Sequence, residues 1–425
     1  MRLIVLDPGH FHATLLQKDM YPELDARVSV YAPLGTELLD YLNRVLLFNA
    51  RSVKPTRWEL DIHCSGSSLE EMLRDLAGDA VVFTGRNRGK IDRMLPALSA
   101  GLHVLADKPW IIASGDMPKL EQALEIAAGK GIVAYDMMTE RYEVTSEIQR
   151  ALVNMPDVFG EPISVVAKSI HHIMKVVAGM PLRRPTWFFD IAEYGEGLAD
   201  VGTHVVDLVQ WTLLPDQPVD YRKDVQILDG RRWPITLSRE QFQTVTGKMD
   251  FPAEIAPAVV DGQFDYYCNN SIHYTLRGVD VKMEILWNWE APAGSGDVYK
   301  AAFRGTRSSI EIRQGAAEKF VPELYIVPAE DSRAAVFAAL SKRVDELQSQ
   351  WPGLSVRQSD NEARLLIPDQ YRVGHEAHFA QVARRFLDYL KDPKSMPAWE
   401  RSYMLAKYYV STWAGLQPAL KPDHP

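Results

Sequence analysis

Short apolar runs alternate with helical patterns along the first third of the chain. The apolar runs predict buried strands because turn residues bound them, while the stretches between them carry apolar residues at helical spacing. The predicted strands are 3–6, 27–31, 79–84, 103–106 and 132–135, and the predicted helices are 13–17, 69–76, 91–100 and 118–129. This alternation is typical of an α/β domain with a parallel, doubly wound sheet.

The pattern changes after about residue 136, where strands follow one another without helices between them. Such runs predict an α+β domain with a large, mostly antiparallel sheet that is covered on one face. The predicted strands are 163–168, 263–267, 271–277, 282–289, 299–304 and 309–313, and the predicted helices are 146–153, 195–211, 334–350, 375–390 and 398–417. Scattered prolines and charges in 221–257 predict an irregular segment. We therefore expect two domains, 1–138 and 139–425.

Composition narrows the class of protein without naming its activity. The chain has 425 residues, a net charge of −9 and interspersed acids and bases, so it lacks the basic stripe typical of nucleic-acid binding. It has no apolar run of membrane-spanning length and no secretory signal pattern. Its two cysteines, Cys64 and Cys268, are far apart and predict neither a disulfide framework nor a metal site. We expect a cytoplasmic location and no membrane partner.

The first predicted strand is followed by Pro8, Gly9, His10, Phe11 and His12, and then by a helical pattern. A strand, a glycine turn and a helix open a nucleotide-binding βαβ unit, in which backbone N–H groups bind a pyrophosphate. Only Gly9 of the usual G-x-G-x-x-G pattern is present. The loop is therefore a degenerate candidate for a dinucleotide site.

Two features of this region leave alternatives open. His10 and His12 form an H-x-H pair that could bind a metal, contact a cofactor or substrate, or pack within the loop. The second strand ends at Tyr31, and the first acid beyond it is Glu37, so no acidic residue stands where NAD enzymes commonly bind the ribose hydroxyls. The sequence does not distinguish NAD from NADP.

Within the predicted helix 195–211, Asp200 and His204 are four residues apart and share one face. An acid next to a histidine, just inside a glycine-rich helix start, is a plausible proton-transfer pair. The alternative is a surface pair on an amphipathic helix.

Two motifs together resemble those of the Gfo/Idh/MocA oxidoreductases, which include glucose–fructose oxidoreductase and inositol dehydrogenase. Asp107-Lys108-Pro109 matches the family's Glu-Lys-Pro motif after the fifth strand, and 195–204 matches its Asp-x-x-x-His helix. The chain departs from the family in three places. Its glycine loop is degenerate, Asp107 replaces the usual Glu, and Arg88-Gly89-Lys90 stands where a histidine is common. The resemblance implies an N-terminal Rossmann domain and an α+β second domain.

The resemblance also implies an activity and its residues. Family members transfer a hydride between the nicotinamide of NAD or NADP and a secondary alcohol or ketone of a sugar, sugar derivative or cyclitol. His204 would be the base, Lys108 would stabilise charge on the substrate oxygen, and Asp200 would orient the substrate or His204. The implied cofactor-binding residues are Pro8, Gly9, His10, Phe11, His12, Tyr31, Thr84, Gly85, Asn87, Asp107, Lys108 and Pro109.

His171, His172 and Trp187 would bind the sugar-like substrate by the same resemblance, although surface exposure or core packing would also explain them. The oligomeric states usual in this family imply a homodimer or homotetramer. Three other functions stay open: an NAD-dependent glycoside hydrolase or lyase acting by transient oxidation, a cofactor-binding regulator without redox activity, and a metal enzyme. The metal enzyme would use Glu196, Asp200 and His204 with a histidine such as His172, whereas the main interpretation assigns no metal.

Overall fold

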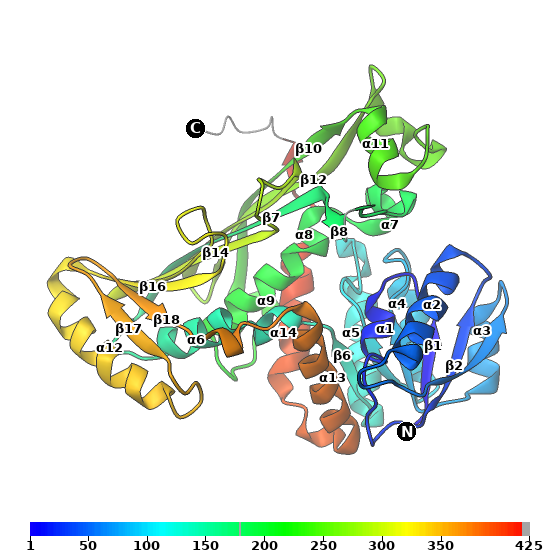
Figure 1. The fold of residues 1–425 in the computed structure, drawn as a ribbon, viewed down its shortest axis with the longest axis horizontal. Coiled ribbons are helices and arrows are strands. Elements are labelled where there is room, and N and C mark those ends of the chain that lie inside the picture. The colour runs from blue at the N-terminus through cyan, green and yellow to red at the C-terminus, as the bar shows by residue number, and fades with distance from the viewer. Residues whose placement is uncertain (178–179, 419–425) are drawn as a thin grey trace. The chain divides into compact units, whose positions relative to one another are not determined.

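The computed structural model describes residues 1–177 and 180–418, and the chain forms two compact units. The first unit contains Met1–Thr139 together with Gly374–Tyr408, and the second contains the described residues of 140–373 and of 409–418. Residues 374–408, which the sequence-based boundaries place in the second domain, therefore belong to the first unit. Figure 1 shows the two helices of residues 374–408 in orange and red.

A six-stranded, entirely parallel sheet forms the centre of the first unit, with the strand order β3-β2-β1-β4-β5-β6. This is the order of a Rossmann fold, as the alternating pattern predicts. The strands are β1 (Leu3–Leu6), β2 (Arg27–Ala32), β3 (Glu59–Cys64), β4 (Ala80–Phe83), β5 (His103–Ala106) and β6 (Ala134–Asp136). All residues of β1 and β4 are buried, as expected for central strands covered on both faces.

Helices α1 to α5 connect these strands, and α13 and α14 join the unit from the C-terminal part of the chain (Figure 1). They are α1 (His12–Leu15), α2 (Thr36–Ala50), α3 (Ser68–Asp75), α4 (Lys90–Ser99), α5 (Met117–Lys130), α13 (His375–Lys391) and α14 (Ala398–Ser411). The sequence pattern missed α2 and β3. Strand β3 is an edge strand whose residues are exposed or half-buried, so it lacks the apolar run that marks the other strands.

Buried polar contacts attach the C-terminal helix α14 to the sheet within the first unit. Lys407 Nζ lies 2.8 Å from Asp136 Oδ2, and both side chains are buried. The Tyr408 hydroxyl donates to the same carboxylate oxygen at 2.9 Å and accepts from the backbone N–H of Trp110 at 3.0 Å. The loop after β5, which carries Lys108 and Pro109, is thus attached to α14 through Trp110.

The second unit is built on an eleven-stranded mixed sheet within the described residues. Its order is β17-β18-β16-β15-β14-β7-β13-β12-β10-β19, with β11 beside β12, and only the pairs β7/β13 and β10/β19 are parallel. The strands are β7 (Pro162–Met174), β10 (Val225–Leu237), β11 (Val259–Val260), β12 (Gln263–Leu276), β13 (Val279–Glu290), β14 (Val298–Gly305), β15 (Ser308–Arg313), β16 (Glu323–Pro328), β17 (Ser355–Gln358), β18 (Ala363–Leu366) and β19 (Gln417–Pro418). A separate hairpin pairs β8 (Val176–Val177) with β9 (Met180–Pro181).

The helices of the second unit pack mainly on one face of this sheet (Figure 1). Helix α6 packs on β15 and helix α9 packs on β7, where Val165 and Ala167 are buried while Val166 points outward and is 55% exposed. The helices are α6 (Val144–Val153), α7 (Ile191–Tyr194), α8 (Gly197–Asp200), α9 (Gly202–Leu213), α10 (Tyr221–Asp224), α11 (Arg239–Thr246) and α12 (Arg333–Leu347). No described helix is long and apolar enough to span a membrane.

The prediction that 221–257 is irregular is wrong. This segment contains the thirteen-residue strand β10 and helix α11. Pro234 lies within β10, where the pairing with β12 shifts register between Trp233 and Ile235. A bulge at this point lets the strand tolerate a residue that cannot donate a ladder hydrogen bond, and a strand containing proline is hard to recognise from sequence.

Candidate functional site

The predicted cofactor residues of the first unit gather at the carboxyl ends of β1, β4 and β5. Strands are added outward from β1 to β3 on one side and from β4 to β6 on the other, so the strand order switches between the parallel neighbours β1 and β4, and open parallel sheets bind their ligands at such a switch point. The loops after these two strands approach closely: a Cβ on Gly85 would lie 2.8 Å from Asp7 O, and one on Gly9 would lie 3.3 Å from Gly85 Cα. Glycine is therefore required at Gly85, and Gly9 leaves little room for a side chain.

His10, His12 and Asp107 form a compact cluster at this edge. His10 Nδ1 donates to Asp107 Oδ2 at 2.8 Å, and His12 Nδ1 lies 3.1 Å from the same oxygen. His12 Nε2 is 2.9 Å from His375 Nε2 at the start of α13. Burial alone would raise the pKa of Asp107, but the neighbouring His12 and His10 outweigh it and lower that pKa well below its usual value. Burial, together with nearby His12 and His378, lowers the pKa of His375 to about 3.

Thr84 and Asn87 follow β4, where the resemblance places cofactor contacts. Lys90, which is almost fully buried, donates to Asn87 Oδ1 at 3.0 Å and to the backbone carbonyl of Asp107 at 2.9 Å. Asn87 thus takes part in an internal link between the loops after β4 and β5. The Thr84 hydroxyl is buried and forms no hydrogen bond in the structure. The sequence did not indicate that Lys90 is buried, because its neighbours Arg88 and Gly89 are typical of an exposed loop.

The remaining predicted cofactor residues differ in exposure. The Tyr31 side chain is buried, donates to Asp75 Oδ2 at 3.2 Å and stacks on His63. Phe11 is 38% exposed, and Lys108 is half-buried. The peptide bond between Lys108 and Pro109 is cis.

Asp200 and His204 of the second unit lie on two helical segments, because the predicted continuous helix is divided into α8 and α9 at Val201. The Asp200 carboxylate is buried and accepts a hydrogen bond from the Tyr194 hydroxyl, and His204 is half-buried. Burial and the neighbouring Asp200 raise the pKa of Tyr194 well above its usual value. Tyr194 was not predicted as a site residue.

Glu196 has a separate set of partners. Its carboxylate accepts from Asn270 Nδ2 at 2.8 Å and pairs with Arg232 at 2.9 Å. Among the described residues, the one cluster of three or more side chains with metal-ligand geometry is His10, His12 and Asp107. The structure therefore gives no support to a metal site made of Glu196, Asp200 and His204.

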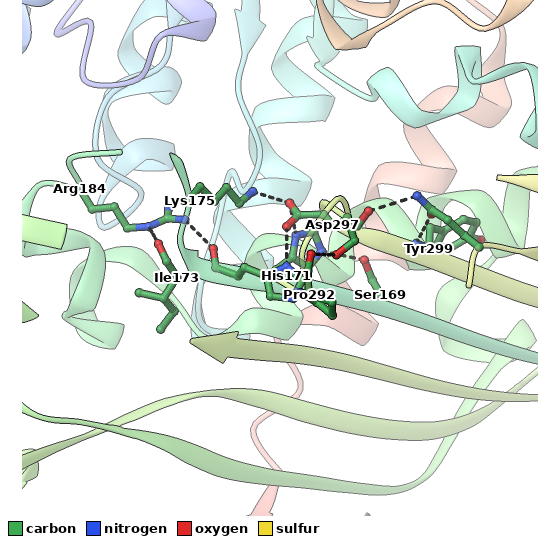
Figure 2. A network of polar contacts seen from close by, with 11 residues as sticks. Ser169, His171, Ile173, Lys175, Arg184, Pro292, Asp297 and Tyr299 are labelled. Carbon is green, nitrogen blue, oxygen red and sulfur yellow. Dashed lines mark hydrogen bonds and ion pairs between the residues drawn. The ribbon is translucent and has the colours of Figure 1, made fainter. Parts of the chain in front are cut away.

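The two predicted substrate histidines converge on Asp297, which immediately precedes β14 (Figure 2). His171 Nδ1 lies 3.0 Å from one carboxylate oxygen and His172 Nδ1 lies 3.4 Å from the other, while Lys175 Nζ donates at 2.5 Å. Burial would raise the pKa of Asp297, but His171 and Lys175 lower it far below its usual value. Asp297 is separated from these residues by over a hundred positions, so no local pattern pointed to it.

Arg184 lies beside this network, as Figure 2 shows. Its guanidinium donates to the backbone carbonyls of Ile173 at 2.8 Å and His172 at 3.0 Å, and it lies over the ring of Phe188. Burial lowers the pKa of Arg184. Trp187 is half-buried, with its ring 5.8 Å from that of Tyr194. The sequence pattern singled out Trp187 and missed Arg184.

Comparisons with known proteins match this architecture. Residues 148–418 match the family model described as "Putative oxidoreductase C terminal domain". A solved structure described as a putative oxidoreductase from Parabacteroides merdae is 40% identical, with a TM-score of 0.94, covering 97% of this chain and 95% of its own. Comparison with curated proteins gives no match.

More distant structures share the fold. The 3-ketoreductase KijD10 from Actinomadura kijaniata, in complex with TDP-benzene and NADP, is 14% identical, with a TM-score of 0.59 and 99% coverage of both chains. A levoglucosan dehydrogenase in complex with NADH and levoglucosan is 13% identical, with a TM-score of 0.61 and 97% coverage of both chains.

Proposed function

Because the chain belongs to the Gfo/Idh/MocA oxidoreductase family, we propose that it transfers a hydride between NAD or NADP and a secondary alcohol or ketone of a sugar, sugar derivative or cyclitol. The observation that carries the proposal is the strand order of the first unit, with Gly9, Gly85 and the motif Asp107-Lys108-Pro109 at the ends of its central strands. The proposed substrate class is supported by the 3-ketoreductase and the levoglucosan dehydrogenase that share the fold.

The residues at the β1–β4 switch point fit a dinucleotide. Gly9 and Gly85 have no side chains, so a ligand could approach their backbone closely. The Thr84 hydroxyl, next to Gly85 in the sequence, is buried and is a further polar group. We assign cofactor binding to the loops that carry Pro8, Gly9, Thr84 and Gly85. The bound nicotinamide would supply the hydride donor or acceptor.

The protein's own residues would manage the proton and the developing charge. When a carbinol carbon loses hydride, its hydroxyl proton needs an acceptor, and we assign this role to the imidazole of His204. The Lys108 ammonium would stabilise negative charge on the substrate oxygen. Asp200, buried and hydrogen-bonded to Tyr194, would act as an orienting group and keep its carboxylate in one position.

Nucleotide binding by the purified full-length protein tests the proposal first. Any nucleotide that copurifies is released by denaturation and identified by mass, and the stripped protein is titrated with NADH and NADPH while fluorescence is followed. We expect saturable binding of at least one of them. The protein is then incubated with NAD or NADP and with myo-inositol, glucose or levoglucosan, and formation of the reduced cofactor is measured by its absorbance.

The two parts of this experiment separate the competing functions. Binding together with net cofactor reduction supports the proposed dehydrogenase. Tightly held cofactor with sugar release and no net reduction would instead indicate the hydrolase or lyase that acts by transient oxidation. Absence of binding by both nucleotides would overturn the proposal, because the degenerate loop would then not form a dinucleotide site.

A further inference from the structure

The cluster of His10, His12 and Asp107 has the composition and the spacing of a metal site. Its atoms His10 Nδ1 and His12 Nδ1 lie 2.8 Å and 3.1 Å from Asp107 Oδ2, and one ligand atom from each residue lies within 4.8 Å of the others. His12 is 5% exposed and Asp107 is 4% exposed, whereas the His10 side chain is 39% exposed. Two of the three side chains are therefore buried, and the cluster is open to solvent at His10.

Hydrogen bonding within the cluster leaves one buried carboxylate oxygen without a partner. Asp107 Oδ1 is buried and forms no hydrogen bond, and His12 Nδ1 is buried with Asp107 Oδ2, 3.1 Å away, as its neighbour rather than a well-aligned partner. Buried polar atoms are nearly always satisfied, and an unsatisfied one costs on the order of 1–3 kcal/mol. The unpartnered carboxylate oxygen beside two imidazole nitrogens, with ligand atoms of all three residues within 4.8 Å of one another, leaves room for a ligand that the three side chains would share.

The contact between His12 and His375 allows a tautomer of His12 that suits a cation. Their Nε2 atoms are 2.9 Å apart, so one of the two rings must donate a proton to the other. When His375 donates, His12 Nδ1–H is a donor to Asp107; when His12 donates, its Nδ1 carries a lone pair that lies 3.1 Å from a carboxylate oxygen. Two electron-rich atoms at this distance repel each other unless a cation lies between them.

We propose that His10, His12 and Asp107 bind one divalent transition-metal ion through two imidazole nitrogens and one carboxylate oxygen. These donors suit zinc and other borderline ions, whereas magnesium and calcium prefer sites made of oxygen alone. Metal–ligand bonds of about 2.0–2.1 Å in a tetrahedral site place ligand atoms roughly 3.3 Å apart, close to the separations of 2.8 Å and 3.1 Å. Small rotations of the side chains would be enough.

Binding requires a rearrangement of one proton that the cluster can accommodate. In the metal-free protein, His10 Nδ1 donates to Asp107. When the metal binds, this ring proton moves to Nε2 through solvent, so His10 remains neutral and its Nδ1 lone pair becomes a ligand. His12 needs no such change if its Nε2 already donates to His375. The site thus gains a cation without having to bury an unpaired charge, because Asp107 is its counter-ion.

Helix α13 supplies the group that positions His12. His375 is the first residue of this helix, and the ring of Phe379, one turn further along, packs 5.3 Å from the ring of His12. A hydrogen bond to the distal nitrogen of a ligating histidine fixes its tautomer and orientation. His375 is therefore a positioning residue of the site.

The inference does not rest on the proposed function, and the zinc experiment needs no nucleotide. Full-length protein purified without a metal-affinity step is treated with chelator, dialysed, and titrated with zinc chloride by calorimetry, with magnesium chloride as the control ion. We expect one zinc ion per chain, with micromolar or tighter affinity, and no comparable binding of magnesium. No zinc binding near one equivalent would overturn the proposal.

Variants locate the ion. His10→Ala removes a partly exposed ligand and Asp107→Asn removes the charge while keeping the shape of the side chain; each should lower zinc affinity more than about 100-fold. His375→Ala should lower it by about 10–100-fold, the range for partners of metal ligands. His273→Ala, which removes a histidine paired with Asp280 in the second unit, is the matched control and should bind zinc as the unchanged protein does.

Folding and nucleotide binding are measured on the same variants. Circular dichroism identifies any variant that unfolds, and His10→Ala decides the question if Asp107→Asn is unstable. Wild-type zinc affinity in folded His10→Ala would overturn the metal site. Loss of zinc binding in this folded variant would uphold the metal site whatever its response to NADH or NADPH, because His10 is also an implied cofactor-binding residue. Zinc binding by unchanged protein that binds no nucleotide would overturn the proposed function alone.

Discussion

Arg141 and Asp207 form a buried, bidentate ion pair within the second unit. Arg141 Nε lies 2.5 Å from Asp207 Oδ2, and Arg141 Nη2 lies 2.7 Å from Oδ1, with both side chains at least 93% buried. Asp207 follows His204 by three positions in α9, so the two residues lie on neighbouring turns of one helix face. The pair therefore fixes the position of the helix that presents the proposed base.

Arg141→Met should destabilise the second unit, because it leaves the buried Asp207 carboxylate without the two N–H donors of the guanidinium. Removing one partner of a buried ion pair costs about 3–5 kcal/mol. Urea unfolding followed by tryptophan fluorescence measures the loss. The double variant Arg141→Met/Asp207→Leu removes both charges and should regain much of the stability. Equal stability of Arg141→Met and the unchanged protein would show that the pair does not hold α9.

Gly197→Ala should also destabilise this region, for a steric reason. A Cβ at this position would lie 2.0 Å from the backbone oxygen of Cys268, so α8 would have to move away from β12. Overpacking of this kind costs about 1–3 kcal/mol. Gly129→Ala is the control: this residue lies in α5 with nothing within 4 Å of an added Cβ, and the change should add about 0.5–1 kcal/mol. Thermal unfolding compares the two, and a stable Gly197→Ala protein would contradict the argument.

The parallel sheet could be predicted from sequence because its signals are local. Strands such as β1 and β4 are short apolar runs that are buried on both faces, and each is followed by turn residues and a helical pattern. The Asp107-Lys108-Pro109 motif follows a strand that was predicted with the bounds it has in the structure. Local pattern was therefore sufficient for the fold class and for the edge of the sheet where the candidate residues gather.

Contacts between distant segments could not be predicted in this way. Nothing near Asp136 indicates that Lys407 is its buried partner, and nothing near His171 indicates Asp297. Likewise, the sequence around His12 does not point to His375. Such pairs are determined by tertiary packing, which also assigns 374–408 to the first unit. Sequence analysis therefore found candidate residues but not the partners that set their charge and orientation.

Glu147 should make the protein less stable as pH rises through neutrality. Burial first, and then the negative charge of Glu143, raise the pKa of Glu147 to about 7, despite a hydrogen bond from Trp351. Its folded-state pKa lies above the unfolded value, so the folded protein binds more protons between these values. Its stability is therefore favoured at low pH and falls as pH rises towards and beyond 7.

Glu147→Gln removes this ionisation while keeping an acceptor for Trp351. At pH 8 the variant should be more stable than the unchanged protein by roughly 1–3 kcal/mol, a range reduced to allow for partial exposure. At pH 5 the difference should shrink or reverse. The exposed Glu240→Gln is the control and should show the same small offset at both values. Urea unfolding at the two pH values measures the effect, and a difference that does not depend on pH would contradict it.

Lys108→Ala and His204→Ala test the two proposed catalytic residues, using whichever of myo-inositol, glucose or levoglucosan gives turnover. Loss of a general base lowers kcat by about 10²–10⁴-fold, and loss of one group that stabilises an oxyanion lowers it by about 10²–10³-fold. Both variants should retain nucleotide binding, because neither removes a glycine of the cofactor loops. Steady-state rates with saturating nucleotide, together with a fluorescence titration, measure the two properties separately.

The pattern of the losses identifies the roles. Added imidazole should restore part of the activity of His204→Ala but not that of Lys108→Ala, because only the former lacks a proton acceptor that a small base can replace. The double variant should lose less than the product of the two single losses, since residues that act in one step are not additive. The exposed Lys130→Ala and His273→Ala are the matched controls and should leave kcat unchanged. Near-normal turnover in His204→Ala would mean that another group accepts the proton.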